Sequence, residues 1–366
     1  MNPNLTHLRR DIADVDRELL ALLGRRFALA AEVGRYKAER GHPIIVREVE
    51  DEVLSRARDA AGACGTTPEV MEGIYRAIVR GAVDRQLRLR VERNAEAATR
   101  VLILGAAGGM GSWLRRFLES VGHRVEGVDV AWAGTESAAG GWAALDEVPE
   151  LRTVGGIFVS VPLETTGNLL QSLAAQQLTM PVVEIASIKS HLQDPILNLR
   201  RAGTPTLSLH PMFGPSKPLC EPMTIVHAVW EDEEIERRRI EELMDHPYVE
   251  LVSLPVEHHD RLMGWLLGLA HLTGLLFAGA LCRSKLDPEE LAKAASTTFA
   301  RQVATAESIL GEDPALYFAI QRLNPYRGAI YAALTSALGE LTGAVEQDDR
   351  AAFAAAMSRA AEALPK

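Results

Sequence analysis

The chain has 366 residues, of which 47% are hydrophobic and 24% are charged, so it is long enough for two or three domains with sizeable cores. Its formal net charge of -10 argues against a general affinity for nucleic acid or for an anionic membrane surface. Cys64, Cys220 and Cys282 lack the spacing of metal ligands, and their odd number suits a reducing compartment. Because the N-terminus is polar and lacks an apolar signal core, we expect a cytoplasmic protein. The net charge favours small molecules as partners, and we expect no metal.

The first part of the chain carries the pattern of a helical unit. Apolar residues recur every three or four positions and predict one long helix over residues 4–40, with a stripe made of Leu5, Leu8, Ile12, Val15, Leu19 and Leu22. At 1.5 Å per residue this helix is about 54 Å long, so we expect it to pack along a partner in a helical dimer. Further helices are expected over residues 47–62 and from Pro68, behind a threonine cap.

Cations continue this stripe along the long helix. Arg26 lies one step of four after Leu22, and Lys37 lies about 20° from Arg26 around the helix axis. Arg9 lies about 100° away by the same geometry and could reach only a partner's pocket. One interpretation is an anion site that two chains share. The other is that Arg26 and Lys37 extend into solvent or pair with carboxylates such as Glu50.

The stretch LRRDIADVDRELLALLGRRFALAAEVGRYK, followed by GHPI, REVE and Gln86, resembles the all-helical chorismate mutase family. The resemblance implies a dimeric mutase domain over residues 1–95 that rearranges chorismate to prephenate through preorganised donors around the breaking C–O bond. It also assigns substrate contacts: the carboxylates to Arg26 and the partner's Arg9, the ether oxygen to Lys37 and Gln86, and the ring hydroxyl to Glu50. Val46 departs from relatives that carry an aspartate near the hydroxyl.

After a polar linker the pattern changes to strand, glycine turn and helix. In RVLILGAAGGMGSWLRRFLESVGHRVEGVDV an apolar strand precedes the glycines, and a second strand ends at Asp129. This is the dinucleotide fingerprint of a Rossmann domain, expected over residues 99–254, with the acidic residue placed for the adenosine ribose of NAD. Ala106 takes the first fingerprint position, so the tight turn is expected to depend on Gly105. The cofactor-binding candidates are Gly105, Ala106, Gly108, Met110, Gly111, Asp129, Ser160 and Pro162.

Three later strands each end in a turn of small and polar residues. Open α/β sheets place their ligands at the carboxyl ends of strands, so these turns are expected to converge on one crevice. The residues concerned are Ser160, Pro162, Ser187, Lys189 and His210. Beside a nicotinamide cofactor, a histidine is well suited to accept the proton of a hydroxyl as hydride leaves.

The motifs SVP, ASIK and HPMFGP resemble prephenate dehydrogenase from about Arg100 to the C-terminus. With the mutase in front, the whole chain resembles the bifunctional chorismate mutase/prephenate dehydrogenase family of tyrosine biosynthesis. The resemblance implies oxidative decarboxylation of prephenate to 4-hydroxyphenylpyruvate, with NAD as hydride acceptor and no metal. It assigns His210 to the ring hydroxyl, Ser187 to positioning of that histidine, Arg301 to a substrate carboxylate, and His271 and, more weakly, His259 to substrate contacts.

Residues 255–366 are strongly helical and are expected to form the all-α dimerisation domain of this family. Segment 262–282 contains no Asp, Glu, Lys or Arg and carries a GxxxG pattern, as a membrane helix does. The alternative is a central helix that is buried on all sides of a helical core. We favour the core helix, because His271 interrupts the apolar run and no other segment resembles a span.

Other interpretations remain open at this stage. Ala270 precedes His271 where relatives commonly carry Arg or Pro, and Ser216 follows Pro215 where several carry an aspartate. These changes leave 4-amino-4-deoxychorismate and 4-amino-4-deoxyprephenate as alternative substrates. The helical N-terminal domain could instead be a non-catalytic dimerising module, or the remainder a different NAD-dependent dehydrogenase. Inhibition by tyrosine, channelling between the sites and dimer geometry are not determined by the sequence.

Overall fold

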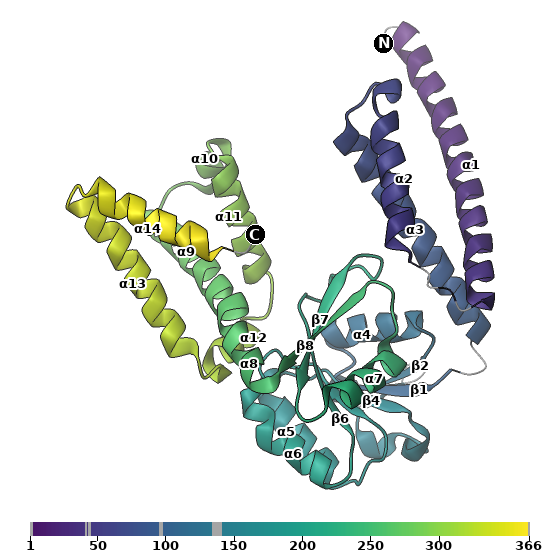
Figure 1. Ribbon diagram of the computed structural model, residues 1–366, viewed down its shortest axis with the longest axis vertical. Helices are drawn as coiled ribbons and strands as arrows, with labels where there is room; N and C mark the ends of the chain where they lie inside the picture. Colours follow the sequence, from purple (N-terminus) through teal and green to yellow (C-terminus); the bar gives the residue numbers. More distant parts are fainter. Residues whose placement is uncertain (1–2, 41, 43–44, 95–97, 134–140, 365–366) are drawn as a thin grey trace.

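Three structural units follow one another along the chain, and Figure 1 shows two helical arms that extend from a central sheet. The computed structural model describes residues 3–40, 42, 45–94, 98–133 and 141–364. The last helix of the first unit ends at Asn94, the sheet runs from Arg100 to Pro255, and helices follow from Val256.

The N-terminal arm consists of three helices, α1 (Pro3–Glu39), α2 (Arg47–Ala60) and α3 (Pro68–Asn94). Both α1 and α2 pack along α3, and their shared core contains Ala31, Leu54, Ala57, Ala82, Val83 and Leu87. The apolar stripe of α1, from Leu5 to Leu22, points away from this core, and its side chains remain 46% to 61% exposed. The stripe is therefore not covered within a single chain. This is what we expect if α1 packs on a second chain.

The central unit is an eight-stranded sheet in the order β3-β2-β1-β4-β5-β6-β7-β8. Its strands are β1 (Arg100–Leu104), β2 (Arg124–Val128), β3 (Gly141–Trp142), β4 (Gly156–Val159), β5 (Val182–Glu184), β6 (Thr206–Pro211), β7 (Met223–Val229) and β8 (Val249–Pro255). Strands β1 to β6 are parallel to one another, whereas β7 runs antiparallel to β6 and parallel to β8. The order reverses between β1 and β4, and such a switch point is where doubly wound sheets bind ligands.

Helices cover both faces of this sheet. On one face, α4 (Gly109–Ser120) and α7 (Glu233–Met244) enclose a core that includes Trp113 and Phe117. On the other face, α5 (Leu163–Ala174) and α6 (Gln193–Arg201) pack over a second core. Short 3-10 turns lie at Gly62–Cys64, Val130–Trp132, Leu145–Glu147, Leu151–Thr153 and Ser190–Leu192.

The C-terminal arm is entirely helical among the described residues. It contains α8 (Val256–Met263), a π-helical segment (Gly264–Leu269), α9 (Ala270–Ser284), α10 (Pro288–Lys293), α11 (Thr297–Leu310), α12 (Pro314–Leu323), α13 (Arg327–Glu346) and α14 (Arg350–Ala363). Side-chain caps start several of these helices, because an Asp or Ser oxygen accepts a free backbone N–H in the first turn. The caps are Asp287, Ser296, Asp313 and Asp349.

The apolar stretch Val256–Ser284 is the one helix in the described residues that is long and apolar enough to cross a membrane. The expectation that it is buried on all sides is wrong for the single chain, because only 11% of its most apolar window is buried. The side of this helix that carries its glycines is the side that packs against other helices. A Cβ on Gly264 would lie 2.6 Å from the Ile330 side chain, and one on Gly274 would lie 2.4 Å from the Ile309 side chain. The opposite side, with Trp265, Leu266 and Leu276, remains exposed.

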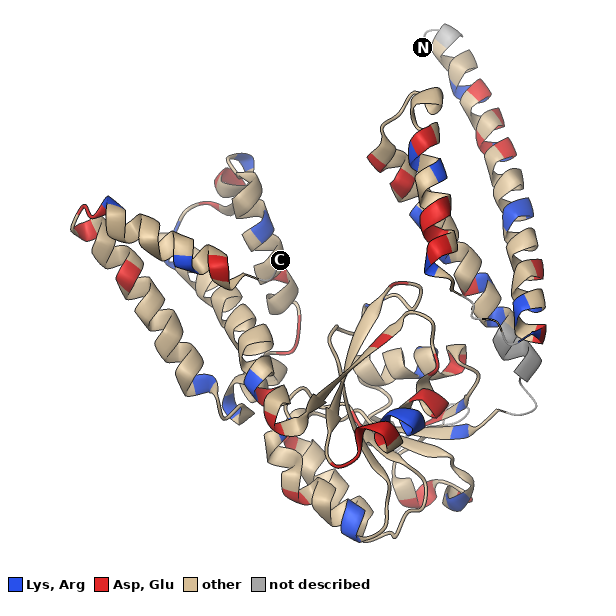
Figure 2. Cartoon of the chain, viewed as in Figure 1, with Lys and Arg blue, Asp and Glu red and all other residues tan. Residues whose placement is uncertain are grey.

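The N-terminal arm contacts the sheet unit mainly through α3, which packs against α4. Arg80 on α3 forms an ion pair of 3.0 Å with Glu221 in the loop between β6 and β7. Trp113 on α4 donates a hydrogen bond to the carbonyl of Lys217 in the same loop. Charged side chains are spread over the N-terminal arm, whereas long parts of α9 and α13 carry none (Figure 2).

Candidate active sites

A tight glycine turn joins β1 to α4. Gly105 has φ of +85°, a conformation that glycine adopts without strain, and its amide donates to the carbonyl of Val128 on β2. A Cβ on Gly111 would lie 2.1 Å from the carbonyl oxygen of Gly105, so α4 can pack on the turn only without one. Gly108 is the N-cap of α4. As expected, Gly105 forms the turn where Ala106 replaces the first fingerprint glycine.

Asp129 follows β2 and lies beside this turn. Its carboxylate accepts hydrogen bonds of 2.9 Å from the backbone amides of Ala107 and Ala131. The free amides at the start of α4 suit a pyrophosphate, and a carboxylate next to them suits a ribose diol. The residues present therefore fit a dinucleotide without a 2′-phosphate.

A crevice of about 510 Å³ lies at the carboxyl ends of the strands. Of the residues expected to converge there, it is lined by Ser160, Pro162, Ser187 and His210. The cofactor candidates Gly108 and Met110 and the substrate candidate His271 line it as well. The C-terminal arm closes it with His271 on α9, Glu312 in the turn between α11 and α12, and Tyr317 on α12. Sequence reasoning missed Glu312 and Tyr317, since nothing in EDPALYFAIQ distinguishes a pocket residue from an ordinary cap and helix.

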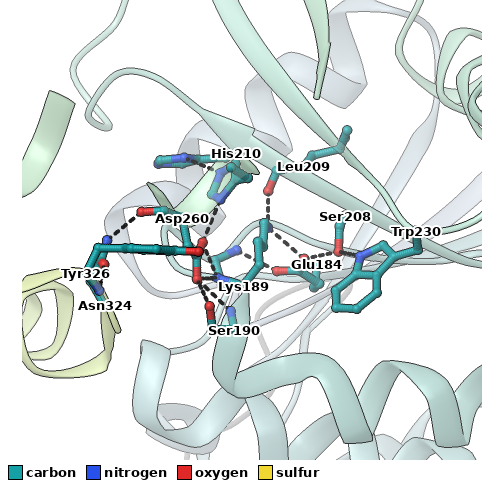
Figure 3. Close-up of polar contacts among 12 residues, drawn as sticks. Glu184, Lys189, Ser190, Ser208, Leu209, His210, Trp230, Asp260, Asn324 and Tyr326 are labelled. Carbon is teal, nitrogen blue, oxygen red and sulfur yellow. Dashed lines mark hydrogen bonds and ion pairs between the residues drawn. The ribbon is translucent and has the colours of Figure 1, made fainter. Parts of the chain in front are cut away.

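His210 lies near the end of β6 and is buried, with one ring edge on the crevice. Its Nδ1 lies 3.1 Å from Nε2 of His259 on α8, and Nδ1 of His259 lies 2.7 Å from Oδ1 of Asp260 (Figure 3). Burial lowers the pKa of His210 well below its usual value, and His259 and Lys189 lower it further, whereas Asp260 opposes them. The imidazole is therefore neutral near pH 7 and able to accept a proton.

Lys189 does not line the crevice, which corrects the expectation that it converges there with His210. Its side chain is fully buried beneath β6, where Nζ lies 2.6 Å from the Glu184 carboxylate and donates to the carbonyl of Leu209. Burial lowers the pKa of Lys189, and Glu184 opposes that shift. A lysine that ends a strand motif can thus reach back into the sheet rather than out to a ligand.

The other substrate candidates of this half differ in position. His271 lines the crevice, and its Nδ1 is buried without a hydrogen-bond partner among the described residues. Its ring packs edge-on against Tyr317, with 4.6 Å between the ring centroids. Burial lowers its pKa. His259, expected as a minor substrate contact, is instead buried behind His210. Arg301 is exposed on α11, about two turns before the crevice residue Ser308.

Ser187 lines the crevice, yet the described residues show no hydrogen bond between it and His210. The histidine is held by His259 instead. The signal for this arrangement was present in VEHHD, where a histidine and an aspartate are adjacent, but the sequence does not show that they face β6.

In the N-terminal arm, Lys37 on α1 and Glu50 on α2 influence each other. Burial lowers the pKa of Lys37, and the negative charge of Glu50 opposes that shift. Burial and the nearby Asp51 raise the pKa of Glu50, and the positive charge of Lys37 opposes that rise. Gln86 on α3 packs on Gly34, one turn before Lys37, where a Cβ would lie 2.7 Å from its side chain. Its Oε1 is buried without a partner among the described residues. An unmatched buried amide is costly unless a ligand satisfies it.

The two predicted arginines of this arm are far apart on α1. Arg26 is half-buried, and Arg9 is exposed seventeen residues earlier, about 25 Å along the axis. Arg9 cannot reach the Lys37 and Gln86 region of its own chain.

Comparisons with known proteins divide the chain in the same way. Residues 8–87 match the family of chorismate mutase type II, and residues 255–359 match the prephenate dehydrogenase dimerization domain. The T-protein of Enterobacter agglomerans is 26% identical over 98% of this chain and 92% of its own. The 4-amino-4-deoxyprephenate dehydrogenase of Streptomyces pristinaespiralis is 28% identical over 72% of this chain and 90% of its own.

The fold of the second part also has solved relatives. The structure of prephenate dehydrogenase from A. aeolicus in complex with hydroxyphenyl propionate and NAD+ has a TM-score of 0.57 at 18% identity and covers 72% of this chain and 96% of its own. The chain thus carries an isomerase and an oxidoreductase in one polypeptide. It belongs to the bifunctional chorismate mutase/prephenate dehydrogenase family.

Proposed function

We propose that residues 1–95 rearrange chorismate to prephenate and that residues 99–366 oxidise and decarboxylate prephenate to 4-hydroxyphenylpyruvate. The observation that carries the second step is a buried neutral histidine, His210, at a crevice between the glycine turn and the helical arm. Both substrates are small soluble acids, in keeping with the cytoplasmic location expected from the sequence.

NAD is the cofactor that fits the turn, and when bound it would supply the hydride acceptor for the oxidation. The backbone amides in the first turn of α4 would hold its pyrophosphate and Asp129 its adenosine ribose, with Met110, Ser160 and Pro162 as further contacts in the crevice. His210 accepts the proton of the ring hydroxyl. Loss of hydride from the ring carbon that bears this hydroxyl leaves a ring carbonyl. The electron pair of the breaking bond to the ring carboxylate then completes the aromatic ring, carbon dioxide leaves, and His210 returns its proton to the phenolate oxygen.

In the mutase half, the donors of Lys37 and Gln86 would meet the ether oxygen of chorismate. Arg26 would hold one carboxylate and the partner's Arg9 the other, with Glu50 at the ring hydroxyl. The raised pKa of Glu50 and the lowered pKa of Lys37 indicate a partly desolvated site that favours such hydrogen bonds. The exposed stripe of α1 and the uncharged faces of α9 and α13 support a homodimer that completes this site.

A coupled assay tests both steps. Purified protein is given chorismate and NAD, or prephenate and NAD, and reduced nicotinamide is followed. His210→Asn should abolish NADH formation from both substrates while prephenate still accumulates from chorismate. Arg26→Ala should abolish turnover of chorismate only. Full prephenate oxidation by His210→Asn, or unchanged mutase activity in Arg26→Ala, would contradict the respective assignment.

A mixing experiment tests the shared mutase site. Arg9→Ala and Arg26→Ala chains are each inactive, but random pairing gives heterodimers with one intact site, so about a quarter of wild-type mutase activity should return on mixing. Two chains with the same substitution provide the matched control. Absence of any recovery between chains that demonstrably exchange would mean that each site takes both arginines from the same chain, which contradicts the shared site.

A second candidate substrate is 4-amino-4-deoxyprephenate, which the S. pristinaespiralis relative is named for. The crevice favours it in one respect: among the described residues its lining contains the Glu312 carboxylate but no Lys or Arg. A larger kcat/KM for the amino compound than for prephenate would reverse the order of the two proposals.

A further inference from the structure

A buried chain of three side chains leads from the crevice into the interface between the sheet and the C-terminal arm. His210 bonds with His259 at 3.1 Å, and His259 bonds with Asp260 at 2.7 Å. All three are buried, and His259 and Asp260 do not line the crevice. These two residues can therefore influence the substrate only through His210.

Asp260 is an anchored acceptor. Its Oδ2 accepts from the backbone amides of Lys189 and Ser190, at 3.0 and 2.6 Å, and from the Ser190 hydroxyl at 2.5 Å (Figure 3). Its Oδ1 accepts from the Lys189 amide and faces His259. Burial favours a raised pKa, but the hydrogen bonds from His259, Ser190 and the backbone outweigh it, and the pKa of Asp260 is lowered. The carboxylate is ionised and can only accept.

The proton positions follow from this anchor. Nδ1 of His259 must carry a proton, because its partner is an ionised carboxylate. Burial lowers the pKa of His259, so its ring is neutral and Nε2 is an unprotonated acceptor. Nδ1 of His210 faces that acceptor and must therefore carry the proton of its own neutral ring. What remains is an unprotonated Nε2 on His210.

We propose that His259 and Asp260 are positioning residues that fix His210 in the tautomer whose Nε2 accepts the proton of the substrate hydroxyl. The inference rests on the proposed dehydrogenase function. As the proton arrives, positive charge develops on His210, which donates to an imidazole that Asp260 has already aligned. Other charged or titratable groups around the chain are Lys189 and Glu184 beneath β6, and His271 and Glu312 on the crevice side.

Asp260→Asn is the sharpest variant, because it should reverse the proton pattern. The oxygen of the new amide belongs at the Oδ2 position, where three donors converge, so its NH₂ group faces Nδ1 of His259. His259 then carries its proton on Nε2 and donates to His210, whose own proton moves to the crevice side. By analogy with an aspartate that orients a catalytic histidine, kcat for prephenate should fall by up to about 10⁴-fold with little change in KM.

Variants of His259 separate orientation from simple packing. His259→Leu removes the acceptor and should lower kcat about 10²-fold, whereas His259→Gln can still accept from His210 and should recover most of that loss. The pH profile should shift with Leu and not with Gln. Mutase activity of the same protein and affinity for NAD are internal controls, and both should stay at the wild-type level.

The tautomer itself is measured by ¹⁵N NMR of the histidine rings, which needs no turnover. The expected result is a proton on Nδ1 of His210 in the wild-type protein and on Nε2 in Asp260→Asn. A proton on Nε2 in the wild type, or His259→Leu turning over within threefold of wild type, overturns the proposal. If the wild type oxidises no prephenate, the proposed function fails, and the ring-nitrogen spectra still decide the proton arrangement. If His259→Leu misfolds, His259→Gln and Asp260→Asn carry the test.

Discussion

Gly111→Ala tests the close packing of α4 on the cofactor turn. The new Cβ would lie 2.1 Å from the carbonyl oxygen of Gly105 and 2.8 Å from Cα of Ala106, both of which are backbone atoms that cannot rotate away. The helix must therefore retreat from the turn. Overpacking of this kind costs about 1–3 kcal/mol, which in a domain of this size lowers Tm by about 2–12 °C. Because the retreat moves the amides that would hold the pyrophosphate, NAD affinity should fall at least about tenfold, or 1.4 kcal/mol.

Gly108→Ala is the matched control for this prediction. Its Cβ would lie 3.4 Å from the carbonyl oxygen of Gly105, an ordinary contact, so Tm should change little. The same Cβ would stand where the pyrophosphate approaches, so NAD binding should still weaken. Calorimetric titration with NAD and thermal unfolding of both variants measure the two effects. If Gly111→Ala melted at the wild-type temperature and bound NAD normally, the packing argument would be refuted.

Three further predictions concern stability. Lys189→Met leaves the Glu184 charge buried without its partner and should lower the free energy of unfolding, measured with denaturant, by about 3–5 kcal/mol. Adding Glu184→Gln should restore part of this loss. An unchanged free energy of unfolding in the single variant would show that the pair is not needed. The pKa of His210 is depressed in the folded state, so unfolding takes up a proton below about pH 6.5, and stability should fall as the pH drops from there. His210→Asn should flatten this dependence of stability on pH. An equal slope in the variant and the wild type would count against the assignment. The Arg80–Glu221 pair is partly exposed to solvent, so Arg80→Ala should change stability by less than about 1 kcal/mol and leave both activities intact. A marked loss of either activity would reveal a coupling role for that contact.

Much of the dehydrogenase site was predictable because strand ends carry local signals. An apolar strand followed by glycines identifies the turn at Gly105, and the parallel order of the strands brings Ser160, Ser187 and His210 to one edge. The partner of His210 was not predictable in the same way. His259 is 49 residues away, and its contact depends on how α8 packs after β8, which no local pattern specifies.

Lys189 shows a second limit of reading the sequence. Its place at a strand end indicated the crevice, but a long flexible side chain can reach Glu184 on the preceding strand, five residues earlier. The mutase half was predictable in its helices, since residues 4–40 were expected and Pro3–Glu39 are observed. Its complete site was not, because a stripe that remains exposed in one chain can be understood only with a second chain.

Because α1 and the helix that contains Trp265 each leave an apolar face uncovered, the stability of this protein should depend on the concentration of its chains. Part of the apolar surface that would stabilise each arm becomes buried only on association, so the midpoint of thermal unfolding should rise with the concentration of chains. Dilution would then separate the activities: the rearrangement, for which we propose an arginine from a second chain, would be lost with the dimer. The residues that line the crevice around His210 in the described part of the chain come from the sheet unit and the C-terminal arm, so its chemistry should decline as far as the C-terminal helices loosen.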